Sequence, residues 1–175
     1  MACLLNKLWG AMAALALLLG AVPVLAEPAP QSFPIEKPPF ECRNFRGLKV
    51  VVQQASGLGD VAKAQIVGRI PFIQVDPERL MTLPPKLQIF FFGHECAHHV
   101  LGHNFYPTPS VETDADCWSI KRGRELGLFK RDDIEAFAPY FAHSKGSNAG
   151  HLPGPERVTR LLQCYDEPGE FAATQ

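Results

Sequence analysis

The chain has 175 residues, of which 46% are hydrophobic, and its 17 basic and 18 acidic side chains give a formal net charge of −1. The two signs are interspersed without a run of like charge, which argues against a nucleic acid or an anionic membrane surface as the partner. The length suits one compact domain with a single core, and no segment repeats at a fixed period.

Residues 1–26 have the pattern of a secretory signal peptide. A lysine-bearing start precedes an apolar run over residues 11–22, and small residues follow at Val24 and Ala26. The run is too short to span a bilayer comfortably, and no cysteine follows it where a lipid anchor would be attached. We therefore expect a periplasmic or secreted chain that begins near Glu27, has no integral membrane segment, and carries 16 basic and 18 acidic residues.

Residues 27–40 are rich in proline and lack periodicity, which predicts an extended leader before a single domain at 41–175. Short β-branched runs then predict the strands of a small sheet: residues 48–53, 64–67 and 72–75.

From residue 82 onward the pattern becomes helical. Pro84 and Pro85 suit the first turn of a helix, and Gly102 suits its end. Three further helices are predicted, one starting between 108 and 110 and ending at 127, and the others at 132–141 and 155–164. Strands come first and helices after, an order typical of an α+β fold.

Four cysteines follow the predicted signal peptide: Cys42, Cys96, Cys117 and Cys164. An even number in an exported chain favours two disulfides, for which three connectivities are open. Cys42 lies near the start of the folded region and Cys164 near its end, so a bridge between them would tie the termini together. Cys96 would then pair with Cys117, although Cys96 lies on the far side of its helix from the histidines.

His94, Glu95 and His98 form the pattern H-E-x-x-H within the segment FFFGHECAHHVLGH. Residues four apart on a helix differ by roughly 40° in direction, so both imidazoles point the same way and can share one metal ion. Glu95 lies beside them, as in zinc proteases. Residue abundances give this pattern by chance in on the order of one in a few hundred chains of this length.

A catalytic zinc ion takes three protein ligands and keeps one position open. The third ligand does not follow metzincin spacing, which would need glycine at Leu101 and histidine at Asn104. Glu112 and Asp116 lie one helical turn apart in the segment VETDADCW and share a face. We expect Glu112 to bind the metal. Asp116 would support it by accepting a hydrogen bond from a ligand histidine or by pairing with an arginine.

These motifs resemble the gluzincin metallopeptidases that carry H-E-x-x-H and E-x-x-A-D. That group contains the CAAX prenyl endopeptidases and their soluble periplasmic and mitochondrial relatives. The resemblance covers residues 83–120, and His151 with Arg157 is similar to a later His-Pro segment of the group that is followed by an arginine. Only thirteen residues separate His98 from Glu112, fewer than in the membrane-bound members.

The resemblance implies a zincin-like domain in which Glu95 is the general base. It also implies the zinc ligands His94, His98 and Glu112, and a histidine often stands in the group where His103 stands here.

The residues themselves predict a zinc-dependent endopeptidase that acts on unfolded or misassembled exported polypeptides. Glu95 would accept the proton of the attacking water and pass it to the leaving amine. A purely structural zinc site would be closed by four ligands, so a carboxylate beside an open position favours catalysis. Two alternatives stay open: a zinc-binding chaperone or assembly factor with little proteolytic activity, and a plain metal-binding exported protein.

The other histidines have simpler interpretations beside the functional ones. His99 would be packed or solvated rather than in contact with substrate, and His103 would either cap the helix end or take part in catalysis. His143 is predicted to be exposed. His151 follows a glycine-rich loop, from which it would reach the open metal position as a lid or as a donor to the transition state. The phenylalanines at 90–92 are predicted to be core residues.

Overall fold

The computed structural model describes residues 38–106, 108 and 110–168. The chain divides into two units, residues 1–31 and 32–175, and every described residue belongs to the second. The predicted signal peptide and most of the predicted leader therefore lie outside the described residues, and both stay predictions.

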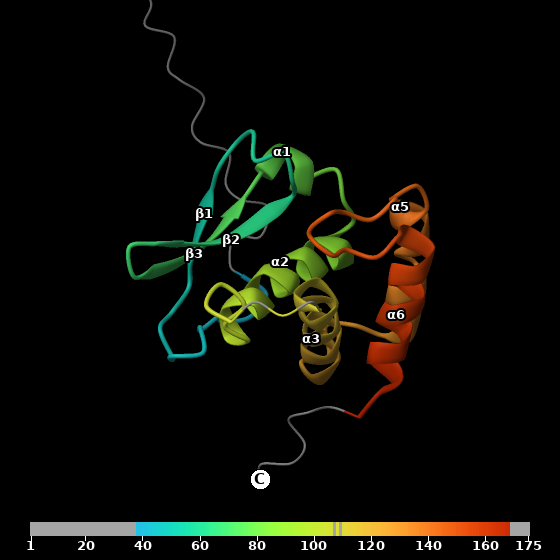
Figure 1. Ribbon diagram of the computed structural model, residues 1–175. Coiled ribbons are helices and arrows are strands. Elements are labelled where there is room, and N and C mark those ends of the chain that lie inside the picture. Colours follow the sequence, from blue (N-terminus) through green and yellow to red (C-terminus); the bar gives the residue numbers. More distant parts are fainter. Residues whose placement is uncertain (1–37, 107, 109, 169–175) are drawn as a thin grey trace, which may run out of the picture. The chain divides into compact units, whose positions relative to one another are not determined.

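A small sheet precedes a set of helices, which confirms the predicted α+β class (Figure 1). The strands are β1 (Val51–Gln54), β2 (Ala62–Val67) and β3 (Ile70–Val75). The helices are α1 (Pro77–Leu80), α2 (Pro85–Val100), α3 (Val111–Glu125), α4 (Arg131–Glu135), α5 (Ala138–Phe141) and α6 (Gly154–Asp166).

The central strand of the sheet is β3, which pairs in parallel with β1 and antiparallel with β2. Strand β2 therefore forms one edge of the sheet, and the backbone groups on its outer side form no hydrogen bonds with β3. Asp76 ends β3 and caps α1, because its carboxylate accepts hydrogen bonds from the backbone of Glu78 and Arg79. The short α1 was not predicted from the sequence.

The long helix α2 packs against β2 and β3 on one side and against α3 on the other. On the sheet side, Phe92 and Ala97 belong to an apolar cluster with Ile73 of β3. On the other side, Phe90 belongs to a second cluster that includes Ile120 and residues of the later helices. Because α2 is covered from both sides, most of it is apolar, and Phe90 and Phe92 are core residues as predicted.

The helices α2 and α3 lie close together at Gly93. A side chain there would overlap the Oγ atom of Ser119, which donates a hydrogen bond to the carbonyl of Phe90 at 2.8 Å. The absence of a Cβ atom at this position thus permits the approach that brings the next turn of α2, including His94, up to α3.

The predicted helix at 132–141 is wrong as a single element, because the structure divides it into α4 and α5. Pro139 explains the break. It has no N–H to bond to the carbonyl of Glu135, and its ring clashes with that carbonyl in a continuous helix.

The four cysteines in the described part of the chain all form disulfides, but the predicted pairing is wrong: Cys42 pairs with Cys96, and Cys117 pairs with Cys164. The Cα atoms are 5.8 Å apart in the first pair and 5.1 Å apart in the second. Cys96 faces the cluster on the sheet side, where Cys42 also lies, whereas Cys117 lies in the second cluster with Cys164 of α6. The two disulfides fit an extracellular or otherwise oxidising environment.

No helix in the described part of the chain is both long enough and apolar enough to cross a membrane.

Candidate metal centre

Two histidines of α2 and a glutamate of α3 meet at one point. The ligand atoms of His94, His98 and Glu112 all lie within 4.8 Å of one another, so the group could hold a metal ion. The two Nε2 atoms are 3.2 Å apart. Glu112 Oε2 lies 3.1 Å from Nε2 of His94 and 3.6 Å from Nε2 of His98. Two imidazole nitrogens and one carboxylate oxygen are a donor set that suits zinc.

Helix geometry and helix packing each supply part of this arrangement. His94 and His98 are four residues apart on α2, so their rings point to the same side. Glu112 lies in the first turn of α3, which crosses α2 closely beside Gly93.

Behind the site, Asp116 joins His94 to α6. Nδ1 of His94 donates a hydrogen bond to Asp116 Oδ1 at 2.8 Å. Arg157 donates two more, from Nε to Oδ2 at 2.8 Å and from Nη2 to Oδ1 at 2.7 Å. The sequence suggested a histidine or an arginine as the partner of Asp116, and the structure has both contacts.

The three groups of this network are deeply buried, since only 3% of His94, 3% of Asp116 and 6% of Arg157 is exposed. The guanidinium of Arg157 also lies over two aromatic rings, 4.8 Å from that of Phe141 and 5.6 Å from that of Phe90. The aromatic faces and the carboxylate together compensate the burial of this cation.

The same contacts shift the pKa values of the site. Burial alone would lower the pKa of His94, but hydrogen bonds to Asp116 and Glu112 raise it to about 10. Burial raises the pKa of Glu112, but its three histidine neighbours hold that pKa well below the ordinary range.

Glu95 lies on the side of α2 that faces the sheet edge. Its Oε2 atom accepts a hydrogen bond from the backbone N–H of Ala64 in β2 at 2.6 Å. The side chain is largely buried, yet it lines a cleft of about 700 Å³ together with His94 and His98. Glu95, the candidate base, and the candidate metal ligands therefore face the same cleft.

The cleft lies between the edge strand β2 and the loop that follows α5. Residues 58–60 and Ala62 to Ala64 form one wall, and residues of the loop at 144–151 form the other. The metal group lies between these walls, where a ligand in the cleft would reach it.

His151 of this loop reaches the site, as the sequence suggested. Its Nε2 atom lies 2.8 Å from Glu112 Oε2, and its ring stacks on that of His94 with centroids 5.5 Å apart. Ser147 holds the other side of the ring, with its Oγ atom 2.8 Å from Nδ1. No feature of the sequence singled out Ser147.

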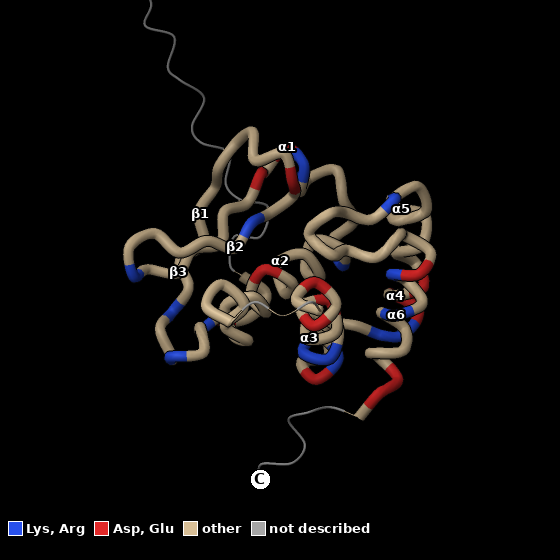
Figure 2. Tube along the Cα trace, in the orientation of Figure 1, with Lys and Arg blue, Asp and Glu red and all other residues tan. Residues whose placement is uncertain are grey.

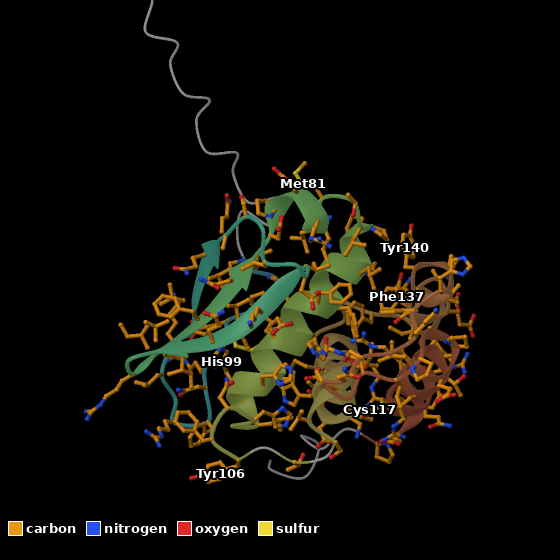
Figure 3. All side chains as sticks on the ribbon, turned by 45° about the horizontal axis from the view of Figure 1, so that its top comes forward. Met81, His99, Tyr106, Cys117, Phe137 and Tyr140 are labelled. Atoms are coloured by element: carbon orange, nitrogen blue, oxygen red, sulfur yellow. A yellow bond between two sulfur atoms is a disulfide. The ribbon has the colours of Figure 1, made fainter. Side chains whose placement is uncertain are left out.

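The remaining histidines divide between packing and the site. His99 lies between α2 and the sheet, buried, with Nε2 2.8 Å from the carbonyl oxygen of Phe72 (Figure 3), so the predicted packing role fits. Burial lowers the pKa of His103, and its Nδ1 atom lies 3.0 Å from Nδ1 of His98. A neutral His103 can accept a hydrogen bond from His98, which leaves Nε2 of His98 free for a metal. His143 is exposed, as predicted.

No family model, curated protein or solved structure matches this chain in the comparisons.

Proposed function

We propose that this protein is a zinc-dependent endopeptidase that hydrolyses peptide bonds of unfolded or misassembled exported polypeptides. The observation that carries the proposal is the convergence of His94, His98 and Glu112 within 4.8 Å, beside a cleft that Glu95 also lines. His94, His98 and Glu112 would hold the zinc ion, which would supply Lewis acidity toward a peptide carbonyl and toward water.

In this proposal, Glu95 moves the proton. One carboxylate oxygen accepts the hydrogen bond from Ala64 N–H, and this contact fixes the orientation of the group. The other oxygen takes the proton of the attacking water and delivers it to the leaving amine. The cleft is open to solvent, and an extended polypeptide can lie along it beside the edge strand β2.

Asp116 and Arg157 keep His94 in the orientation and tautomer that a metal ligand needs. The carboxylate of Asp116 accepts a hydrogen bond from Nδ1–H of His94, so Nε2 is the nitrogen that faces the metal group. Arg157 holds the carboxylate from behind with two hydrogen bonds. Such partners orient metal ligands and raise their basicity.

The H-E-x-x-H and E-x-x-A-D motifs support placing this chain near the gluzincin group, as a soluble exported member. The two disulfides and the signal-like segment at 1–26 support a periplasmic or secreted location.

One observation favours a second candidate, a zinc-binding chaperone or assembly factor with little proteolytic activity. In the structure, His151, the candidate donor to the transition state, already lies against Glu112. A site held in this state would bind metal while cutting few substrates.

The decisive experiment compares the wild type with Glu95→Gln, a change that keeps the size of the side chain and removes the base. The variant should keep its zinc and its fold, while hydrolysis of an unfolded protein falls by at least about 10² to 10⁴-fold. Glu156→Gln is the matched control, because Glu156 is exposed in the first turn of α6 and should leave the rate unchanged.

Metal analysis and a peptide-library digestion of the wild type complete the test. If the wild type contains zinc but cuts nothing, and both proteins suppress aggregation of a client equally, the chaperone proposal is correct. If the purified protein takes up no zinc, both candidates fail.

A further inference from the structure

Three turns that carry exposed apolar side chains lie together at one end of the sheet. They are residues 43–49 before β1, residues 67–70 between β2 and β3, and residues 101–106 after α2 (Figure 1). We call them the tip turns. Their most exposed apolar side chains are Leu48 (50%), Val67 (60%), Ile70 (52%) and Tyr106 (64%).

Packing and register join the tip turns into one surface. The ring of Phe45 lies 5.4 Å from that of Phe105 and 6.0 Å from that of Tyr106, which ties the first turn to the third. In addition, β1 and β3 pair in parallel from Val51 and Phe72. Two residues before each of these, Lys49 and Ile70 belong to the first and second tip turns, which are therefore neighbours.

The charges on this surface have one sign. The tip turns carry Arg43, Arg46, Lys49 and Arg69, all exposed, and contain neither aspartate nor glutamate. Figure 2 shows blue and no red on these loops. Arg43 pairs with Glu41, whereas no ion pair within the described residues involves the other three. The overall charge of −1 conceals this local excess.

Arg46 combines both properties of the surface. Its guanidinium carbon lies 5.0 Å from the ring centroids of both Phe45 and Phe105. Cation and aromatic rings thus form one exposed group, a combination that suits the boundary between lipid headgroups and acyl chains.

We propose that the tip turns bind the surface of a membrane that contains anionic phospholipids. The exposed apolar side chains would enter the headgroup region while Arg46, Lys49 and Arg69 contact the lipid phosphates. Because the charge excess is local, the negative charge elsewhere on the protein lies farther from the lipid, where salt screens it.

The shape of the surface favours lipid over other anionic partners. A peptide side chain would need a pocket to anchor it, but the hollow beside Phe45 and Phe105 has no room even for a water molecule. A single-stranded nucleic acid needs open aromatic faces for stacking. Here the rings pack edge to face on one another, and Arg46 covers two of them.

The test is co-sedimentation of the full chain with phosphatidylcholine vesicles, with and without about a third of phosphatidylglycerol, near physiological ionic strength. The wild type should bind the anionic vesicles and leave the neutral ones. Lys49→Glu with Arg69→Glu should weaken binding about 25-fold or more, since each basic residue near such a surface contributes about fivefold. Leu48→Ser with Tyr106→Ser should weaken it about tenfold or more.

The control is Lys130→Glu with Lys145→Glu, which changes the net charge equally at two exposed lysines outside the tip turns and should keep binding within about twofold of the wild type. All substitutions are on exposed side chains, and circular dichroism would check that each variant folds. The proposal is overturned if the wild type binds no vesicles, binds neutral ones equally well, or loses binding in the control. It is also overturned if the wild type self-associates or binds nucleic acid, and the tip-turn variants lose that property while their binding to vesicles is unchanged. None of these readouts depends on zinc or on proteolysis.

Discussion

Replacing Asp116 by asparagine would test the buried network behind the metal group. Asparagine has the shape of aspartate, but it cannot neutralise Arg157, which is only 6% exposed. Removing one partner of a buried ion pair costs about 3–5 kcal/mol, because the other charge stays buried without compensation. We expect the free energy of unfolding of the metal-free protein to fall by that amount.

The same change should weaken zinc binding by about 10 to 100-fold. A neutral amide oxygen accepts the hydrogen bond from His94 Nδ1 less strongly than a carboxylate does, so the imidazole is held less firmly and is less basic. Stability and metal affinity therefore decrease for two different reasons.

A second variant separates these reasons. Arg157 lies over the rings of Phe141 and Phe90, so methionine at 157 would find an apolar environment. Combining Arg157→Met with Asp116→Asn removes the unpaired charge and should recover most of the lost stability. Zinc affinity should stay low, because the partner of His94 is still neutral.

Urea denaturation of the metal-free proteins and zinc competition against a coloured chelator would measure the two quantities. If Asp116→Asn unfolds at the same urea concentration as the wild type, the network does not stabilise the fold. If the double variant is as unstable as the single one, an uncompensated arginine is not the cause.

Three further changes and one titration test other contacts. Glu112→Ala should lower zinc affinity more than Asp116→Ala does, by about 100-fold or more, and the reverse ranking in a zinc competition assay would make Asp116 the ligand. His151→Ala should alter the rate of hydrolysis and retain zinc, whereas loss of metal would identify His151 as a ligand. Gly93→Ala should cost about 1–3 kcal/mol of stability by overlap with Ser119, and a second change, Ser119→Gly, should relieve it in thermal unfolding. Thiol titration of the denatured, unreduced protein should find no free cysteine among the four in disulfides, and two reactive thiols would contradict the pairing.

The metal group could be predicted from the sequence because its parts are local. Two histidines four residues apart on a helix share a face whatever the rest of the chain does. The glutamate was found in the same way, from a carboxylate pair one turn apart on the following helix. Sequence did not specify the distance between α2 and α3, which depends on the contact of Gly93 with Ser119.

The disulfide pairing could not be predicted in this way. The loops that the alternative pairings close differ in length, but loop-closure entropy changes only slowly with length, so it does not decide among the pairings. What decides the pairing is which cluster each cysteine joins. The position of Cys96 opposite the histidines did indicate the side of α2 that faces the sheet, but the nearness of Cys42 to that side comes from tertiary packing.

The break between α4 and α5 could have been predicted from a local feature of the sequence, but the helical pattern of residues 132–141 was given more weight. Pro139 interrupts the predicted helix at 132–141, and a proline in a helix interior costs about 3 kcal/mol or more. The reach of His151 and the contact of Glu95 with Ala64 are different in kind, because both join residues from separate elements. No periodicity or spacing contains that information.

The pairing that the structure has connects the disulfides to the site. Cys117 follows Asp116 on α3, and Cys164 lies two turns after Arg157 on α6, so the second disulfide joins the same two helices as the buried ion pair. The first disulfide joins α2, beside Glu95, to the segment before β1. Each bridge thus fixes an element that carries a residue of the site. The two disulfides and the buried ion pair therefore hold together the elements that carry the candidate ligands.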